Sequence, residues 1–495
     1  MADYGALSLV PPLLTIAIAL YSKNVLFALS CGIFSGSLII VDFNPFAAVL
    51  NSVENQVLKE ISSGTQVQVI LTIFVIGGFV KLLEVSGGAS AFARKMSSIV
   101  TSGAKAQLLA WLTGIGIFFT DSGNSLIVGP LYRTLFDEFK ICREKLAYIL
   151  DTTSSPISIL IPFIGWGAYI MSLIERSYQE IGRDENAFSV LINVIPYQFY
   201  AFLALAAVPI LVLSGKEFGP MRATQMKYRA SLKENEAMQE QLANPDADEN
   251  YRIGVFLYPL AVMLLLIGGL ITWHATHGGI SGIHIRSTLV IAYIAASFTC
   301  MEMMRRYQSV SYAESLAVFI KGAESLVYIS IVLVLAWSLS SVTKDVHTAD
   351  YLASIISGSV SPTFFPMIVF ALGALISLST GSSYGTFAIL MAIAVPLGFE
   401  LNASMYLTIA AVLSGGLFGD HVSPISDTTV LASAGAECGH LAHVTTQGAY
   451  AAATGFVALL AFGAAGIYES GLVLPLAIVV LVILLNVLLR TNRKE

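Results

Sequence analysis

Long apolar runs recur along almost the whole chain and restrict its fold more than any other feature of the sequence. A run of about 20 apolar residues is long enough to cross the hydrocarbon core of a bilayer as a helix. Only 12% of the 495 residues are charged, whereas soluble domains carry about 25%. The sequence therefore predicts an all-α polytopic membrane protein. Eleven windows qualify as full spans: 6–22, 24–42, 66–84, 145–172, 190–214, 253–273, 285–303, 322–342, 404–435, 444–467 and 472–490.

The sequence lacks the motifs of several classes of function, namely redox or metal centres, ATP-driven transport and hydrolytic catalysis. The four cysteines are scattered without the spacing of a redox or metal site, so we expect neither disulfides nor a cofactor. No phosphate-binding loop of the G-x-x-x-x-G-K-[ST] type occurs, which argues against ATP as a driving force. Ser426, His421 and Asp427 lie close together in the sequence, but no nucleophile-elbow pattern surrounds them, and we do not expect an enzyme. The first apolar run lacks a basic leader and is expected to be a span rather than a cleaved signal.

The placement of lysine and arginine predicts the orientation of the chain. If the N-terminus faces outward, 21 of the 26 basic residues lie on the cytoplasmic side, as the positive-inside rule requires. The five left outside are Lys59, Arg176, Arg183, Arg286 and Lys344. The C-terminus is then cytoplasmic, and the expected location is a bacterial inner membrane.

Two further apolar stretches, 106–131 and 363–396, are interrupted midway by polar residues. Basic residues flank the first stretch on both sides, so both of its ends belong on the cytoplasmic side. Counting spans places both ends of the second stretch outside. We therefore expect two re-entrant hairpins, with tips near 120–125 and 380–386, in addition to about 11 full spans.

The two halves of the chain have the same order of elements but start from opposite sides of the membrane. This pattern predicts an inverted-topology repeat, an architecture of secondary transporters that places the binding site near the midplane. A short sequence echo supports it, because Ser155-Pro-Ile-Ser158 and Ser423-Pro-Ile-Ser426 fall in equivalent elements. The expected domains are a first repeat at 1–214, a charged cytoplasmic linker at 215–252, a second repeat at 253–468 and an additional C-terminal helix at 469–495.

The segment 414–429 has the wrong chemistry for a plain span. Asp420 and Asp427 would each cost roughly 2.5–3.5 kcal/mol at the centre of a membrane helix. Pro424 removes a backbone donor between them. Carboxylates and broken backbone are tolerated at this depth only where they line a cavity enclosed by protein. Carboxylate, hydroxyl and carbonyl oxygens are also the ligands that a small hard cation needs.

Three more polar breaks, at the two hairpin tips and at 151–156, would converge with this segment if the repeats pack face to face. Half-helix ends at such tips favour ions of either sign. The candidate ion- or substrate-binding residues are Asp121, Ser122, Asn124, Ser125, Asp151, Thr152, Ser155, Thr380, Ser382, Ser383, Thr386, Asp420, His421, Ser423, Ser426, Asp427 and Thr428. Of these, Asp121, Asp151, Asp420 and Asp427 are the candidate Na⁺ ligands.

Purely structural roles stay open for several of these residues. Asp121 could cap the helix that follows it, and Asp151 could pair with Lys145. The small residues at 380–386 could serve only close helix packing. Asp427 is expected to act as both cap and ligand, and Asp420 with His421 as a proton-responsive pair.

Five motifs together resemble the NhaC-type sodium/proton antiporter family: TDSGNSLIVGP (120–130), REKLAYILDTTSSP (143–156), GWGAY (165–169), TGSSYGTFAI (380–389) and GDHVSPISDTT (419–429). The resemblance covers most of the two repeats. It implies secondary active exchange of Na⁺ for H⁺, with Asp121, Asp151, Asp420 and Asp427 handling the ions. The sequence departs from the family pattern at Ser122, where a second acidic residue often follows, and at Ser154-Ser155, where alanines are common.

The resulting hypothesis is an antiporter that exchanges cytoplasmic Na⁺ for protons by alternating access. One or two desolvated carboxylates would bind either ion. The alternative is a cation-coupled transporter of a small organic acid, of the malate or lactate type, or of an amino acid, which would use the same ion site. The expected partners are the bilayer, Na⁺ and H⁺, with a homodimer possible and no nucleic acid.

Overall fold

The computed structural model describes residues 4–234, 252–277, 281–356 and 360–491, and the regular elements in these ranges are all helices. The elements before the linker are η1 (Gly5–Leu9), α1 (Val10–Ser22), α2 (Val25–Ile40), α3 (Pro45–Leu50), η2 (Asn51–Leu58), α4 (Lys59–Ile61), α5 (Gly64–Val85), α6 (Gly88–Ser97), α7 (Gly103–Gly116), α8 (Asp121–Glu138), α9 (Arg143–Thr152), α10 (Ser155–Ser158), α11 (Gly165–Glu180), α12 (Ala187–Val194), η3 (Ile195–Tyr197) and α13 (Phe199–Ser214).

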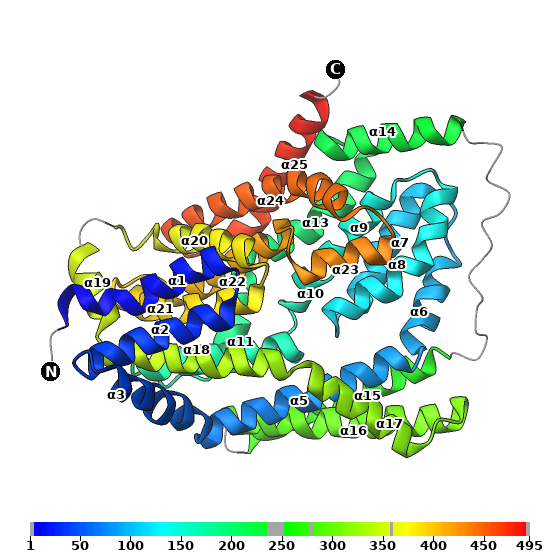
Figure 1. The fold of residues 1–495 in the computed structure, drawn as a ribbon. Coiled ribbons are helices and arrows are strands. Elements are labelled where there is room, and N and C mark those ends of the chain that lie inside the picture. Colours follow the sequence, from blue (N-terminus) through cyan, green and yellow to red (C-terminus); the bar gives the residue numbers. More distant parts are fainter. Residues whose placement is uncertain (1–3, 235–251, 278–280, 357–359, 492–495) are drawn as a thin grey trace.

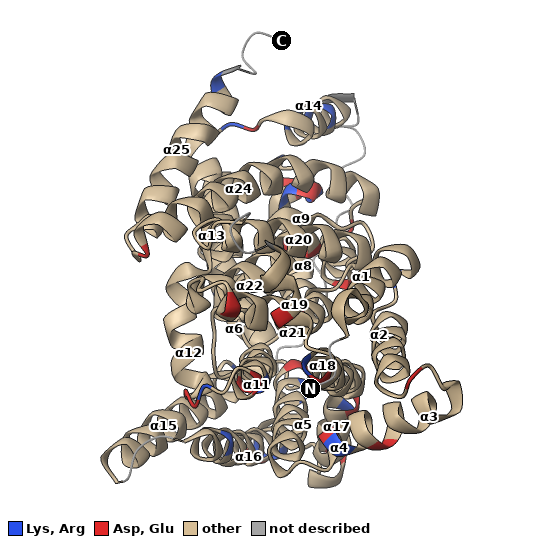
Figure 2. Ribbon diagram, turned by 90° about the vertical axis from the view of Figure 1, so that its left-hand side faces the viewer, with Lys and Arg blue, Asp and Glu red and all other residues tan. Residues whose placement is uncertain are grey.

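The remaining elements are α14 (Gly219–Glu234), α15 (Gly254–Thr276), α16 (Gly282–Gln308), α17 (Tyr312–Ser325), α18 (Val327–Asp345), α19 (Thr348–Ile356), α20 (Phe365–Thr380), α21 (Ser383–Glu400), α22 (Met405–Val422), α23 (Asp427–Ala436), α24 (His440–Tyr468) and α25 (Val473–Thr491). Long helices run side by side through the molecule, with α5, α15, α16 and α17 in a layer at the bottom of Figure 1. In Figure 2 most of the ribbon is tan, so few charged residues interrupt these helices.

Nine helices in the described part of the chain are long and apolar enough to cross a membrane, or up to ten with the bent pair of α12–η3 and α13 counted as one span. The prediction of a polytopic all-α membrane protein is confirmed. The number of full spans differs from eleven for local reasons. The window 145–172 is divided into α9, α10 and α11, and the window 24–42 holds only the 16 residues of α2.

The stretches 106–131 and 363–396 each hold a pair of helices that meet at the predicted polar break, and a hydroxyl side chain caps the second helix of each. Helix α21, expected as one arm of a re-entrant hairpin, is itself one of the nine candidate spans. The Oγ1 atom of Thr120 accepts a hydrogen bond from the backbone N–H of Gly123 at the start of α8. The Oγ atom of Ser382 accepts one from the N–H of Gly385 at the start of α21. These caps satisfy amides that a helix start leaves unpaired, which fixes the two breaks at the predicted polar positions.

The helices that follow the polar breaks in one half of the chain pack against the corresponding helices of the other half. Helix α23 packs along α8, and α11 packs along α21 (Figure 1). The first contact is unusually close, because a Cβ added to Gly129 of α8 would lie 2.3 Å from the backbone oxygen of Gly435 of α23. Two glycines therefore let these helix backbones touch without side chains between them.

The described part of the charged linker is a docked helix. Gln225 of α14 accepts a hydrogen bond from the N–H of Cys142 (2.9 Å) and donates one to the carbonyl oxygen of Lys140 (2.8 Å). The Tyr228 hydroxyl donates to Asp137 at 2.9 Å. The described part, Gly219–Glu234, is thus a helix held against the turn between α8 and α9, while 235–251 lies outside the described residues.

Candidate functional site

A cavity of about 500 Å³ lies where the polar breaks meet, and we call it the central cavity. Its wall includes Asp121 from the first hairpin, Asp420 before the break of the last broken span, and Asp427 after it. The other predicted residues in the wall are Thr380, Ser382, Ser383 and Thr428. Three of the four candidate carboxylates therefore face one space, although 299 residues separate the first from the second in the sequence.

Four helices begin at the central cavity: α8, α11, α21 and α23. Their first residues, Asp121, Gly165, Ser383 and Asp427, all line it. The N-terminal end of a helix carries a partial positive charge of about half an elementary charge and presents unpaired backbone N–H groups. The cavity therefore combines ionisable carboxylates with the positive ends of four helices.

Asp420 is the most enclosed of the cavity carboxylates, at 3% exposed. Its Oδ2 atom accepts a hydrogen bond of 2.9 Å from the hydroxyl of Ser383 at the tip of the second hairpin. Its Oδ1 atom is buried and has no hydrogen-bond partner among the described residues. An uncompensated buried carboxylate is costly, so this group needs a proton or a cation.

Asp427 is exposed at the start of α23 and faces the cavity. The cap of this helix is Ser426, whose side chain accepts a hydrogen bond from the N–H of Thr429. The expectation that Asp427 is the cap is wrong, because Asp427 occupies the first helical position instead. Its Oδ1 atom accepts only the neighbouring N–H of Thr428, at 3.0 Å, among the hydrogen bonds of the described side chains.

Asp121 likewise does not cap its helix, because Thr120 does. The Oδ2 atom of Asp121 accepts a hydrogen bond of 3.1 Å from the indole N–H of Trp166. The Trp166 ring also contacts Tyr384 of the second hairpin, with 4.6 Å between ring centroids and a tilt of 47° between the ring planes. Trp166 thus orients one cavity carboxylate while contacting the opposite hairpin.

Glu84 and Lys81 complete the charged lining, and neither was predicted as part of the site. Glu84 accepts a hydrogen bond of 2.8 Å from the Thr120 hydroxyl and forms an ion pair of 3.0 Å with Lys81. Both residues belong to α5, at the end of an expected span. No polar break marks them in the sequence, and only the packing of the hairpin tip against α5 brings them to the cavity.

Asp151 lies apart from the central cavity in a second, fully buried polar cluster. Its Oδ2 atom accepts hydrogen bonds from Thr429 (3.0 Å) and Gln447 (2.6 Å), and lies 3.5 Å from Nε2 of His443. His421 also joins this cluster, with its Nε2 atom 3.9 Å from the same carboxylate oxygen.

This cluster bears on one expectation, the pairing of Asp420 with His421, and on one open alternative, the pairing of Asp151 with Lys145. The Nδ1 atom of His421 lies 2.7 Å from the Tyr200 hydroxyl, so His421 faces away from the cavity that Asp420 lines. Lys145 does not pair with Asp151; its ammonium group lies 2.9 Å from Glu217.

The other predicted residues lie outside the wall of the central cavity. The amide of Asn124 donates to the carbonyl oxygens of Gly114 and Thr153 and ties the first hairpin to the break after α9. Ser423 donates to the carbonyl oxygen of Leu378. Ser125 and Ser155 have buried hydroxyls without a partner among the described residues. Thr386 donates to its own helix, Thr152 lies 3.5 Å from His421, and the side chain of Ser122 is not described.

The carboxylates do not form a preassembled metal centre. Within the described ranges, no group of three His, Cys, Asp or Glu side chains lies close enough to hold a metal ion. The cavity carboxylates are instead distributed around a space that water or a small solute can enter. Such an arrangement is compatible with reversible ion binding.

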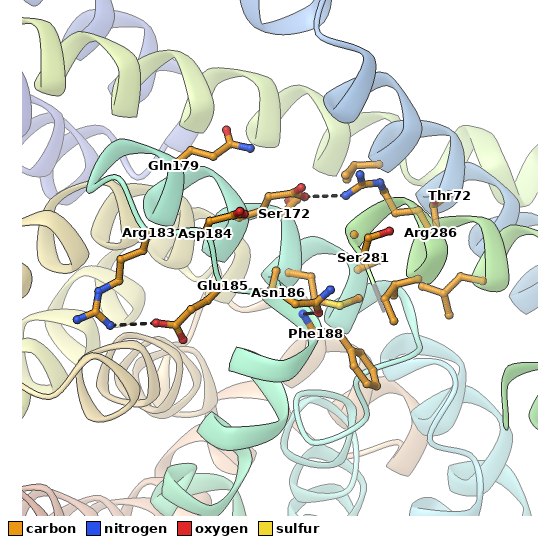
Figure 3. A pocket seen from close by; sticks show the side chains of 18 residues that line it. Thr72, Ser172, Gln179, Arg183, Asp184, Glu185, Asn186, Phe188, Ser281 and Arg286 are labelled. Carbon is orange, nitrogen blue, oxygen red and sulfur yellow. Dashed lines mark hydrogen bonds and ion pairs between the residues drawn. The ribbon is translucent and has the colours of Figure 1, made fainter. Parts of the chain in front are cut away.

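A second pocket, of about 370 Å³, lies between α11, α16 and the turn before α12 (Figure 3). Its two arginines are already paired, Arg286 with Glu175 at 2.7 Å and Arg183 with Glu185 at 3.1 Å. It contains none of the predicted site residues, so the central cavity remains the candidate site.

Several known proteins and one family model are similar to this chain. The model of the Na⁺/H⁺ antiporter family matches residues 159–467. A Haemophilus influenzae protein described as uncharacterized is 31% identical over 94% of this chain and 92% of its own length. The malate-2H⁺/Na⁺-lactate antiporter of Bacillus subtilis is 36% identical over 17% of this chain and 18% of its own. The crystal structure of the YdaH transporter of Alcanivorax borkumensis has the same fold, with a TM-score of 0.59, 14% identity, and coverage of 86% of this chain and 89% of that one.

Proposed function

Because the chain belongs to the Na⁺/H⁺ antiporter family, we propose that it exchanges cytoplasmic Na⁺ for protons at the central cavity. One observation carries the assignment to this cavity. Four carboxylates, those of Glu84, Asp121, Asp420 and Asp427, share it with a single ammonium group, that of Lys81. The excess negative charge calls for cations, and the enclosed Asp420 is the group best placed to exchange one for another.

The proposed mechanism is competition at Asp420. A proton on this carboxyl neutralises it, whereas a Na⁺ ion does so by direct coordination, helped by the Ser383 hydroxyl. Asp121 and Asp427 would supply further oxygen ligands across the cavity. Because one group cannot hold both ions, each departure of Na⁺ is coupled to the arrival of a proton.

The inverted repeat is part of the same proposal. It is supported by the two capped hairpins and by the reciprocal packing of α8 with α23 and α11 with α21. Repeats of this kind alternate access by rocking around a fixed central site. We assign 1–214 and 253–468 to the repeats, and 469–495 to a helix added after them.

We further propose a bacterial inner membrane as the location, with the N-terminus outside and the linker and C-terminus in the cytoplasm. The distribution of lysine and arginine supports this orientation. In the structure, Arg143, Lys145 and the start of the linker lie together at one end of the helices, as residues on the same side of a membrane should.

A second candidate function is cation-coupled transport of a small organic acid. The specific observation in its favour is the convergence of four helix N-termini and Lys81 on the central cavity, since both attract a carboxylate. The name of the Bacillus subtilis relative points in the same direction.

Transport in proteoliposomes tests the primary proposal. An imposed Na⁺ gradient should change the internal pH of vesicles that contain the wild-type protein. The Asp420→Asn variant, which keeps its shape but cannot titrate, should lose this response. Ser383→Ala should keep the response with roughly tenfold weaker Na⁺ dependence, because hydrogen bonds to charged groups contribute about 1.5–3 kcal/mol.

Ser379→Ala is the matched control, because the Ser379 hydroxyl bonds only to the carbonyl oxygen of Leu375 in its own helix. Full exchange by Asp420→Asn would remove Asp420 from the mechanism. A pH response that requires malate or lactate in the vesicles would favour the second candidate.

A further inference from the structure

A third pocket, of about 460 Å³, lies at the ends of several helices. It shares no lining residue with the central cavity. We call it the linker pocket. Its walls are the first turn of α7, the turn between α8 and α9, the end of α13, the helix α14 and the end of α25. Both α13 and α25 belong to candidate membrane spans, and the pocket lies at the ends of these helices. In the proposed membrane orientation, this is where the hydrocarbon core gives way to headgroups.

Three basic side chains line the linker pocket: Lys216, Arg222 and Arg229. None of them lies within ion-pair distance of an acidic side chain in the described part of the chain. Among the described residues that line the pocket, Glu217 is the only acidic one. Its carboxylate is already bound to the Lys145 ammonium at 2.9 Å and to the Tyr450 hydroxyl. Within the described part of the chain, the pocket therefore offers positive charge that no carboxylate pairs with.

The opposite wall of the linker pocket is apolar. It is formed by four buried side chains: Ile141 from the turn between α8 and α9, Leu211 and Val212 from α13, and Leu489 from α25. The first residue of α7, Gly103, also faces the pocket, and a helix N-terminus adds to its attraction for an anion. A cationic rim above an apolar wall at the end of two spans matches a molecule with a phosphate head and a hydrocarbon tail.

We propose that the linker pocket binds an anionic phospholipid, with the phosphate at Lys216, Arg222 and Arg229 and the first acyl carbons against the apolar wall. The bound lipid would hold α14 against the transmembrane helices, where Gln225 and Tyr228 already fix it to the turn before α9. This assignment is independent of which ions the central cavity carries.

Native mass spectrometry of the purified full-length protein tests the proposal. The probes are phosphatidylglycerol and phosphatidylcholine with the same acyl chains. The wild-type protein should retain phosphatidylglycerol preferentially. The triple variant K216Q/R222Q/R229Q should lose this preference, and R222Q alone should weaken it about fivefold, since each basic residue near an anionic lipid contributes about 1 kcal/mol.

The control triple variant K95Q/K227Q/K321Q removes the same charge from exposed lysines that do not line the pocket. It should bind phosphatidylglycerol like the wild type. An equal loss in both triple variants would overturn the proposal in favour of general surface charge. Displacement of the lipid by equal concentrations of inorganic phosphate or glycerol 3-phosphate would overturn it in favour of a soluble anion.

Discussion

At the scale of single residues, Trp166 connects the two hairpins through one cavity carboxylate. Its indole N–H donates to Asp121 while its ring packs on Tyr384. The carboxylate is therefore held in one orientation from the far side of the cavity. Trp166 is a positioning residue in the proposed exchange, because it acts on the ion through Asp121.

The variant Trp166→Phe keeps the ring contact but removes the N–H donor. We expect the KM for Na⁺ to rise about tenfold, with a smaller change in kcat, because a hydrogen bond to a charged group is worth about 1.5–3 kcal/mol. Initial rates of Na⁺-driven pH change measure both constants. Trp111→Phe is the control, since the Trp111 N–H has no hydrogen-bond partner among the described residues. Equal effects of both variants would contradict the role of Trp166.

Sequence alone predicts those cavity residues that interrupt an apolar run. Asp420 and Asp427 stand out because carboxylates and a proline are expensive inside a span. Glu84 and Trp166 could not be predicted in this way. Glu84 ends an apolar helix where a charged flank is expected, and Trp166 is unremarkable in a membrane protein. Their roles arise from contacts with residues 36 and 45 positions away in the sequence.

At the scale of helices, the spans follow from the apolar pattern to within a few residues. The expected window 253–273 becomes α15 (Gly254–Thr276), and 444–467 becomes α24 (His440–Tyr468). The pattern fails where polar residues break a helix without leaving the membrane region, as in 145–172. There the ends are set by hydrogen bonds from other helices, such as those of Asn124, which no local pattern records.

The contact between α8 and α23 predicts that one added methyl group, in the variant Gly129→Ala, lowers both stability and exchange activity. In Gly129→Ala the new Cβ would lie 2.3 Å from the backbone of Gly435, which cannot move aside as a side chain could. Overpacking of this kind costs about 1–3 kcal/mol. We expect a lower Tm in detergent and a loss of exchange.

Gly268→Ala is the matched control for this contact, because a Cβ there meets no atom within 4 Å. It should leave exchange unchanged and raise stability by at most about 1 kcal/mol, as glycine-to-alanine changes in helices do. If the Gly129→Ala protein were as stable and active as the control, the close contact between α8 and α23 would not be required for folding or exchange.

An ion-pair cluster at the other end of the helices predicts a pH dependence of stability. Arg176 lies 2.7 Å from Glu60 and 3.4 Å from Glu180, so one guanidinium serves two carboxylates. Burial raises the pKa of Glu60 above its usual value of 4.5, although Arg176 opposes this. A folded-state pKa that is raised means that the folded protein holds the proton more tightly. The contribution of Glu60 to stability therefore falls as the pH rises above about 4.5.

The Glu60→Gln variant should remove this dependence. We expect the Tm of the wild type to fall more steeply than that of Glu60→Gln as the pH rises above about 4.5, the usual pKa of this carboxyl. The difference between the two slopes isolates Glu60 from all other titrating groups. The exposed Glu54 provides the control, and Glu54→Gln should follow the wild type. Parallel curves for Glu60→Gln and the wild type would contradict the raised pKa.

At the scale of the whole molecule, the proposed orientation predicts which loops a membrane-impermeant reagent can reach. Cysteines placed at Ala230 in the linker helix and at Ser281 before α16 should label from opposite faces in a background free of native cysteines. The reason is that α15, a candidate membrane span, lies between them and would cross the membrane once in the proposed orientation. Labelling from a single face would be incompatible with the inverted repeat.

The glycine contact between α8 and α23 has a mechanical consequence. Close backbone contact resists sliding of α8 along α23, so in the proposed exchange Asp121 and Asp427, the first residues of these helices, would move together as one pair. Asp420 of α22 and Ser383 of α21, joined by their hydrogen bond, form a second pair on the other side of the cavity. In the proposed exchange, an increase in the distance between the two pairs would remove ion ligands from one side and leave the hydrogen bond between Asp420 and Ser383 in place. The affinity for the ion would then depend on the separation of the two pairs, and not on the rearrangement of any single side chain.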